Sequence, residues 1–587
     1  MIIYGDTKEK VTYTEGLKRL EALAMGFKGN GPSGHEPATE LLINTGEFEA
    51  ALTDFLFPEC DFINNLLCIV RELSTAAGHI FIHSLNKNVP LSNRWLYTFK
   101  EVLSRLKKFN VSPSLTYSLP EGYAFYSLYP EMYLRSVEKF CREFHPTEVT
   151  VIGIRSIGTS LSALVSARME ETGPVAVHSF TVRPRGFYFD RKIVLDTFME
   201  EELKKFNKGF YLIVDEGPGL SGTSFTSVAE KLTGLGISDE KIIFFPGHRN
   251  DGDSFVSEKA RSVWKKHRQF TSEFEEVISV KNLFPGFIKE VKDVSAGMWR
   301  DVLFKNHEEF PPVYPNFEQR KYLSQDNKYL IKFAGLGRYG RDLYERGKVL
   351  WEAGFSPEVL ALENGFILSR FSEEKPLAAH DVNRALLDRA ASYISFLGKT
   401  FQAESGRNFN EIEEMIQVNL LKGMGEEWAE RFSNISSSFK PLFSTHATAV
   451  DGRMLPCEWL YSNGAYLKTD SVQHHKDHFF PGCQDVAYDI AGFLTEFSLG
   501  KEEKQYFVKS YIKQSGDKEI EARLPFYYIF YNAFRLGMTL FSAQMSMEPE
   551  KRKFNFLSGK YSDNLKIRLI NIGTGSSSPA SGMGSLP

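Results

Sequence analysis

Two adjacent carboxylates followed by a glycine-rich turn form the clearest chemical pattern in the sequence. Asp215 and Glu216 follow the apolar run 211–214 and precede the small residues of 217–224. Glycines allow tight turning, and the N–H groups of such a turn, helped by the positive end of the following helix, bind phosphate. Paired carboxylates beside it can accept hydrogen bonds from vicinal hydroxyls and stabilise positive charge on an anomeric carbon. The pattern indicates a sugar-phosphate site.

A second small-residue turn follows an earlier apolar run. The run 149–154 ends at Arg155, whose guanidinium suits bidentate contact with phosphate. Ligands of open α/β sheets bind at the carboxyl edge of the strands, so both turns are expected at one edge. The basic segment 182–192 follows the next apolar run and has two interpretations, a loop that closes over phosphate or a charged surface turn. Its basic residues are Arg183, Arg185, Arg191 and Lys192.

The segment 211–225 resembles the phosphoribosyl-pyrophosphate motif of type I phosphoribosyltransferases, with its apolar strand, two acids and Gly/Thr-rich loop. The resemblance implies that Asp215 and Glu216 are catalytic acids on the ribose hydroxyls, and that Mg²⁺ bridges the pyrophosphate to the protein. The alternative is a generic strand-to-helix turn. The residues implied to bind phosphoribosyl pyrophosphate are Arg155, Ser156, Gly158, Thr159, Ser160, Arg183, Arg185, Gly217, Ser221, Gly222, Thr223 and Ser224.

Short apolar runs separated by helical stretches must position these residues. The runs are rich in β-branched side chains and have the pattern of buried parallel strands; they span 149–154, 175–182, 210–214 and 241–246. We therefore expect an α/β fold for residues 148–310, a phosphoribosyltransferase-like parallel sheet flanked by helices. Residues 1–147 are expected to be mostly helical and to help shape the acceptor site.

Residues 311–572 follow a different pattern, which begins at two adjacent prolines. A hairpin, a lysine-bearing strand, a helix and a strand pair follow in the order of the N-lobe of aminoglycoside-phosphotransferase-type kinases, which this segment resembles. The resemblance implies an α+β, two-lobed kinase-like domain. In it Lys332 would hold the phosphates of ATP, and Glu345 or Glu352 of the next helix would pair with that lysine.

The second lobe matches the kinase pattern less well. The resemblance implies that Asp470 is a Mg²⁺ ligand and that Asp489 is a structural aspartate. Kinases carry a catalytic aspartate followed five residues later by a metal-binding asparagine. Counting from Asp451 reaches Pro456, which has no side chain able to bind metal. An inactive, phosphate-binding lobe is therefore the alternative to an active kinase.

Two local patterns in this half have modest interpretations. The segment 335–340 matches GxGxxG, but no βαβ unit surrounds it, so it is interpreted as a turn into a helix. His474, His475, Asp477 and His478 form a dense cluster. A zinc site there would need ligands from elsewhere in the chain. A loop with hydrogen-bonding or substrate roles is the other interpretation.

Composition narrows the classes of function. The chain has 587 residues, with 70 basic and 74 acidic side chains, so no global charge bias points to nucleic acid or to anionic membrane. Its five cysteines lack CxxC spacing, which favours reduced thiols in the cytoplasm. No segment is apolar for long enough to predict a membrane span. The Gly/Ser/Pro-rich tail 573–587 is expected to be disordered.

These patterns predict a multidomain cytoplasmic enzyme with small-molecule partners, and they leave a homodimer open. The first interpretation is a phosphoribosyltransferase that transfers ribose 5-phosphate to a small, nucleobase-like acceptor, fused to an ATP-dependent small-molecule kinase-like domain. The alternative is a regulatory or stress-effector protein that senses phosphoribosyl pyrophosphate or a nucleotide and carries a pseudokinase lobe.

Overall fold

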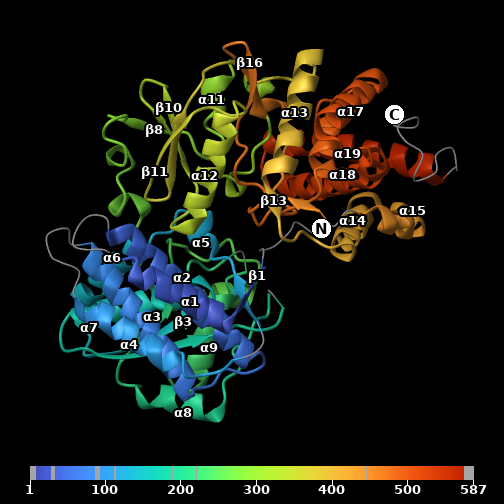
Figure 1. The fold of residues 1–587 in the computed structure, drawn as a ribbon. Helices are drawn as coiled ribbons and strands as arrows, with labels where there is room; N and C mark the ends of the chain where they lie inside the picture. Colours follow the sequence, from blue (N-terminus) through green and yellow to red (C-terminus); the bar gives the residue numbers. More distant parts are fainter. Residues whose placement is uncertain are drawn as a thin grey trace.

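A computed structural model describes residues 8–27, 34–85, 93–111, 114–187, 189–219, 221–443 and 446–573. The predicted disordered tail lies outside the described residues from position 574 onward. Figure 1 shows a lower part, formed by the N-terminal helices and a parallel sheet, and an upper part formed by an antiparallel sheet and a helical lobe.

The centre of the lower part is a five-stranded parallel sheet in the order β4-β3-β5-β6-β7. Its central strand, β5, pairs in parallel with β3 on one side and β6 on the other. The predicted α/β fold with a parallel sheet is therefore confirmed. The strands are β3 (Glu148–Ile154), β4 (Ala176–Val182), β5 (Phe210–Val214), β6 (Ile242–Phe245) and β7 (Arg268–Gln269), and the intervening helices are α7 (Ile157–Glu171), α8 (Thr197–Lys205), α9 (Thr223–Gly234) and α10 (Glu258–Trp264).

Helices dominate the residues that precede this sheet. They are α1 (Tyr13–Met25), α2 (His35–Leu56), α3 (Asn65–Ser84), α4 (Asn93–Leu106), α5 (Glu121–Ala124) and α6 (Pro130–Phe144), with a short antiparallel pair, β1 (Lys8–Thr12) and β2 (Ser114–Ser118). Among the described residues, only α3 has the length and apolar composition of a membrane span, and 67% of its apolar window is buried inside the protein. Helices α2 and α3 both pack against α7, which covers the sheet.

The upper part begins with an antiparallel sheet in the order β11-β12-β10-β9-β8. The strands are β8 (Val291–Asp293), β9 (Lys321–Ser324), β10 (Tyr329–Phe333), β11 (Val359–Glu363) and β12 (Phe366–Arg370); the short α11 (Arg300–Leu303) follows β8, and α12 (Arg338–Glu352) connects β10 to β11. Strand β8 pairs with β9 but precedes residue 311. The antiparallel sheet therefore includes a strand from before the predicted boundary at residue 311, because β8 forms its edge next to β9.

One apolar core joins the two sheets. It contains Val149 and Leu212 of the parallel sheet together with Phe333 and Phe366 of the antiparallel sheet. Phe274, from the connection between the sheets, belongs to the same cluster. The two sheets therefore share an apolar cluster, whereas the helical lobe has a separate cluster of its own.

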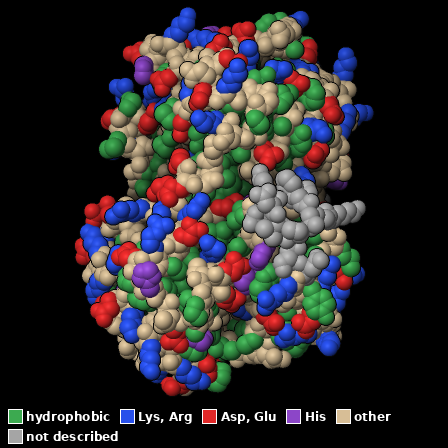
Figure 2. All heavy atoms as spheres, turned by 90° about the vertical axis from the view of Figure 1, so that its left-hand side faces the viewer, with side chains coloured by type: hydrophobic (Ala, Val, Ile, Leu, Met, Phe, Trp, Pro, Cys, Tyr) green, Lys and Arg blue, Asp and Glu red, His purple; other side chains and the backbone are tan. Residues whose placement is uncertain are grey.

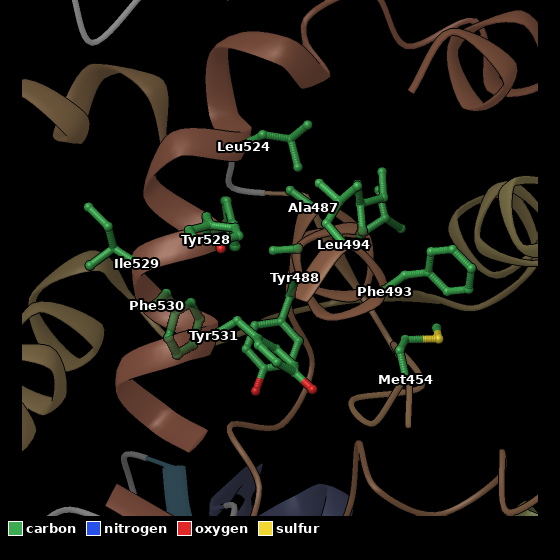
Figure 3. Packing of buried hydrophobic residues seen from close by; sticks show 14 of the residues in the cluster. Met454, Ala487, Tyr488, Phe493, Leu494, Leu524, Tyr528, Ile529, Phe530 and Tyr531 are labelled. Carbon is green, nitrogen blue, oxygen red and sulfur yellow. The ribbon is translucent and has the colours of Figure 1, made fainter. Parts of the chain in front are cut away.

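The remaining chain forms a helical lobe. Its elements are α13 (Arg384–Thr400), α14 (Phe409–Met424), α15 (Glu426–Ser436), α16 (Ala487–Glu496), α17 (Lys501–Ser515), α18 (Ile520–Met545) and α19 (Glu550–Gly573), with the strand pairs β13 (Gln402–Ala403)/β14 (Ala447–Thr448) and β15 (Trp459–Ser462)/β16 (Ala465–Lys468). Figure 3 shows Tyr488 and Leu494 of α16 against Leu524, Tyr528 and Tyr531 of α18. This apolar contact makes α16 a rigid support for the loop that lies over it.

Candidate functional site

A cavity of about 240 Å³ lies between the antiparallel sheet and the helical lobe. Side chains of the sheet, such as Val359 and Ile367, provide its apolar side, and residues 369–372 line one end. Charged side chains from both lobes also line the cavity; they include Glu318, Lys321, Lys332, Arg453, Glu458, Lys468 and Asp470. An apolar pocket with a few convergent polar groups is the usual form of a small-molecule site.

Lys332 of β10 and Asp470, just after β16, form an ion pair in this cavity. Arg453 donates a second hydrogen bond to Asp470, from Nη2 to Oδ2 at 2.8 Å. Burial alone would raise the pKa of Asp470, but the two neighbouring cations hold it well below its ordinary value. Asp470 is therefore an anion in the folded protein, with two cations around it.

The structure corrects the predicted partner of Lys332, because Glu345 points to solvent. Its side chain is 61% exposed, and its carboxylate lies 3.8 Å from Lys348. Glu352 is also exposed. Gly347 is the residue of α12 that lines the cavity. Two residues correspond to about 200° of helix rotation, so Glu345 falls on the opposite side of α12.

Asp489 of α16 positions the loop that follows β14. Its carboxylate accepts hydrogen bonds from the N–H groups of Asp451 and Gly452, both at 2.8 Å. Burial, together with the nearby charge of Asp451, raises the pKa of Asp489 to about 7. Asp451 itself is turned inward, where Tyr393 donates to its carboxylate at 2.6 Å. Its side chain is fully buried, so Asp451 does not face the cavity.

Two loop residues five positions apart do face Asp470, namely Arg453 and Glu458. Arg453 forms ion pairs with both Glu458 and Asp470. In kinases this spacing separates the catalytic aspartate from the metal-binding asparagine. Counted from Arg453, this spacing reaches Glu458, whereas counted from Asp451 it reaches Pro456.

The histidine cluster divides between two places. His474 lies beside Asp470 of the cavity lining, with its Nε2 at 3.9 Å from Asp470 Oδ2 and a side chain 1% exposed. Ligand atoms of Glu458, Asp470 and His474 all lie within 4.8 Å of one another. Burial holds the pKa of His475 well below its ordinary value. His478 contacts the lower part of the protein, where its Nε2 lies 2.9 Å from the hydroxyl of Tyr126.

The predicted sugar-phosphate residues lie at the carboxyl edge of the parallel sheet. Asp215 and Glu216 follow β5, and Glu216 accepts a hydrogen bond from the N–H of Gly122 at 2.9 Å. Burial raises the pKa of Asp215 to about 7, although the charges of Arg183 and Arg191 oppose the shift. Asp215 is therefore partly protonated near neutral pH and lies within the field of two arginines.

The loop between β5 and α9 has the backbone that the sequence predicts for a phosphate turn. Gly217 begins it, and Gly219 and Gly222 adopt positive φ values of 58° and 67°. A side chain at Gly222 would collide with the ring of Phe255. The Ser221 and Thr223 hydroxyls lie 3.0 Å apart. Arg191 donates to Ser224 Oγ at 2.6 Å, so this arginine reaches the start of α9.

The other predicted phosphate arginines are occupied by carboxylates. Arg155 is fully buried and pairs with Asp54 at 2.8 Å and with Asp61. Arg183 pairs with Asp54, and Arg185 pairs with Asp61 at 2.7 Å. Asp54 and Asp61 were missed by sequence reasoning because they lie far upstream, at and beyond the end of α2. A pyrophosphate role for these three arginines stays a prediction.

The turn after β3 is also held tightly by packing. Ser156 adopts φ 147°, a conformation that favours glycine and is strained for serine. A side chain at Gly158 would lie 2.6 Å from the carbonyl oxygen of Val214. Thr159 and Ser160 are buried in α7, where the Ser160 hydroxyl lies 2.9 Å from that of Tyr123. Ser156 is therefore the most accessible of these four residues.

No protein-family model and no curated protein matches the chain. Among solved structures, it is similar to choline kinase LicA from Streptococcus pneumoniae, with 12% identity, a TM-score of 0.31 and coverage of 41% of this chain and 89% of that chain. A choline/ethanolamine kinase family protein from Mesorhizobium loti has 13% identity and a TM-score of 0.33, over 44% of this chain and 90% of that chain. A glucosamine kinase in complex with glucosamine, ADP and inorganic phosphate has 11% identity and a TM-score of 0.33, over 43% of this chain and 80% of that chain.

These neighbours are small-molecule kinases. In this chain the order of β10, α12, β12, the loop 451–458, Asp470 and α16 is itself kinase-like. Figure 2 shows basic and acidic side chains interspersed over the coloured atoms of one face, without a broad area of one sign.

Proposed function

We propose that the upper cavity binds a nucleoside triphosphate such as ATP and does not transfer its phosphate as an active kinase does. The base would lie against the apolar side chains of the sheet near residues 369–372, and the phosphates would lie at Lys332. The observation that carries this proposal is the position of Arg453 between Glu458 and Asp470.

Arg453 supports binding and opposes turnover for one chemical reason. A kinase positions an acceptor hydroxyl with an aspartate that takes its proton. Guanidinium stays protonated at all accessible pH values and has no acceptor atom, so Arg453 cannot take that proton. An arginine is, however, a strong partner for phosphate oxygens. The cavity is therefore suited to holding a nucleotide.

The carboxylates of the upper cavity are suitable ligands for a divalent cation. Glu458 and Asp470 offer the oxygen ligands that Mg²⁺ uses beside nucleotide phosphates. When bound, such an ion neutralises phosphate charge. Arg453 now contacts both carboxylates, so a cation and this guanidinium compete for the same oxygens.

Binding and turnover can be measured separately on the full-length chain. Isothermal titration with ATP, in the presence of Mg²⁺ and then of Mn²⁺, is expected to show saturable binding. ADP release with a panel of amino-alcohol and amino-sugar acceptors is expected to stay at the level of a protein-free control. Turnover in the range of about 1–100 s⁻¹ typical of kinases would overturn the proposal, and so would the absence of nucleotide binding.

A second function is proposed for the lower part, which is transfer of ribose 5-phosphate from phosphoribosyl pyrophosphate to a small acceptor. Asp215 and Glu216 support it because they stand at the carboxyl edge of a parallel sheet, where such folds bind ligands. The positive-φ glycines and Arg191 support a phosphate cradle at the start of α9. If the lower part has this function, the upper cavity would sense the nucleotide and regulate the transfer.

Pyrophosphate release tests this second function. Phosphoribosyl pyrophosphate, Mg²⁺ and a panel of nucleobases are expected to give release with the natural chain and none with the double variant Asp215→Asn/Glu216→Gln. Asp190→Asn, at a solvent-exposed carboxylate on the nearby hairpin, is the matched control and should retain activity. Equal release by the double variant would exclude these carboxylates from the reaction.

A further inference from the structure

A cluster of metal-ligating side chains borders the upper cavity and differs from the usual kinase pair of aspartate and asparagine. We propose that Glu458, Asp470 and His474 bind one divalent transition-metal ion, and that the site prefers Mn²⁺ to Mg²⁺. The inference deepens the proposed nucleotide site, on which it rests, by naming the metal and a third ligand.

The geometry of the three side chains suits one ion. Their ligand atoms lie within 4.8 Å of one another, which leaves room for a central cation at ordinary ligand distances. The side chains are largely inside the protein, with exposed fractions of 7% for Glu458, 17% for Asp470 and 1% for His474. Two carboxylates and one imidazole supply a net charge of −2 to the ion.

The orientation of His474 is that of a metal ligand. Its Nδ1 lies 3.0 Å from the carbonyl oxygen of Asp451. A carbonyl only accepts, so Nδ1 carries a proton, and a ring with this single proton presents a lone pair at Nε2. Nε2 is buried without a hydrogen-bond partner among the described residues and points toward Asp470. Metal-bound histidines typically donate their other N–H to a carbonyl or carboxylate in this way.

A lone pair facing a carboxylate is unfavourable unless a cation lies between them. The Nε2 of His474 and Oδ2 of Asp470 are 3.9 Å apart, too far for a hydrogen bond. A bound ion would satisfy Nε2 and would take the place of Arg453 at Oδ2. The one alternative, a protonated imidazole paired with Asp470, is an outcome that the test below distinguishes.

Arg453 neutralises the two carboxylates when no ion is bound, and it has space to leave. The residue lines the 240 Å³ cavity and also an adjoining cavity of about 540 Å³. Rotation toward the larger cavity would free Glu458 and Asp470. The formal charges around the site cancel, since three cations (Lys332, Arg453 and Lys468) stand against three carboxylates (Asp451, Glu458 and Asp470). The positive charge of a metal ion is therefore tolerated best when negatively charged nucleotide phosphates bind with it. Metal and nucleotide should therefore strengthen each other's binding.

The imidazole sets the preference among metals. Mg²⁺ takes oxygen ligands almost exclusively and keeps several waters. Imidazole suits Mn²⁺ less than it suits Co²⁺ or Zn²⁺, but all three accept it more readily than Mg²⁺ does. A site with one nitrogen ligand among carboxylates therefore discriminates against Mg²⁺.

Electron spin-echo spectroscopy of Mn²⁺ added to the full-length protein tests the inference directly. Coupling to a directly bound imidazole nitrogen is expected in the natural chain, with and without ATP. The His474→Gln variant should lose this coupling and at least about tenfold in Mn²⁺ affinity, while its Mg²⁺ affinity changes less than threefold. His380→Gln, which removes a surface imidazole 86% exposed, should behave as the natural chain.

The outcomes separate this inference from the proposed function. Nitrogen coupling without any ATP binding would support the metal site and sink the nucleotide proposal. ATP binding with no nitrogen coupling, or with equal affinities for Mn²⁺ and Mg²⁺, would overturn the metal site and leave the nucleotide site standing. The spectrum of the natural chain is decisive even if the His474 variant does not fold.

Discussion

The hydroxyl of Tyr126 and the Nε2 of His478 lie 2.9 Å apart, although 352 positions separate these residues in the sequence. Tyr126 follows α5, whose Gly122 donates its N–H to Glu216 at the sheet edge. His478 follows the loop that carries His474. The short segment 122–126 therefore contacts Glu216 at the edge of the parallel sheet and also His478, which follows the loop beside the upper cavity.

This contact predicts communication between the two sites. In Tyr126→Phe, each ligand should bind with an affinity within about twofold of the natural chain, because the ring stays in place. The thermal shift given by phosphoribosyl pyrophosphate should, however, lose its dependence on added ATP. An unchanged dependence in the variant would mean that coupling, if present, follows another route.

Lys332 of β10 and Glu345 of α12 give a paired test of the ion pair that the structure corrects. Lys332→Ala should weaken ATP binding by roughly tenfold to a hundredfold, since a charge-assisted contact to phosphate is lost. Glu345→Ala should change ATP affinity less than twofold because its carboxylate is exposed beside Lys348. Titration calorimetry measures both. A large loss in Glu345→Ala would restore the original assignment.

Arg453→Asp places a carboxylate at the position that we propose for the base of a kinase. We expect the variant to release ADP from ATP in the presence of Mn²⁺ at a rate at least about tenfold above that of the natural chain, because a proton acceptor is restored. Arg453→Gln removes the same guanidinium without adding a base and should stay near the background rate. Equal rates in these two variants would argue against the assigned position.

Asp215 makes stability depend on pH. Its pKa is raised by burial to about 7 from an ordinary value of 3.8, so the folded protein favours the protonated form. The stabilisation is complete below pH 4 and is lost as the pH rises through 7. Relative to the natural chain, Asp215→Asn should therefore gain roughly 2–4 kcal/mol in unfolding free energy between pH 4 and pH 8. Urea unfolding at several pH values measures this; a difference that is flat with pH would contradict the assigned pKa.

Helix α12 offers a matched pair of arginines that contact α2. Arg338 lies 2.8 Å from Glu47, whose side chain is 5% exposed. Arg338→Met should cost roughly 3 kcal/mol, since it leaves a buried carboxylate without its cation. Arg341→Met breaks a contact to the exposed Glu36 at 3.0 Å and a longer one to the buried Glu40 at 3.5 Å, and should cost less, about 1 kcal/mol. Thermal unfolding compares them, and equal costs would contradict a special role for Glu47.

The elements of the parallel sheet were predictable because buried strands are continuous apolar runs. The runs 149–154 and 210–214 correspond closely to β3 and β5. The backbone of the predicted phosphate turn could also be predicted, because its glycines stand where the backbone adopts positive φ. Ion pairing was not. Asp54 and Asp61 meet Arg155 only through the placement of α2 and the segment after it, which no local pattern records.

The upper site illustrates a different limit. Lys332 and Asp470 were identified from order along the chain, and the structure brings them together. Which side chains of the loop 451–458 face the cavity depended instead on their contacts with Asp470, which lies 17 positions after Arg453 in the sequence. Without that relation, an aspartate in the loop was the natural starting point, and the arginine two residues later was overlooked.

Strand β8 has a practical consequence for dissecting the molecule. A truncated chain that begins at residue 311 would lack this strand and expose the backbone of β9 as a free sheet edge. It would also strip the lower sheet from the shared apolar core, leaving Phe333 and Phe366 facing water. Free edges and uncovered aromatic rings promote aggregation. Expression of the upper half alone should begin before residue 291 and would still need a cover for that core.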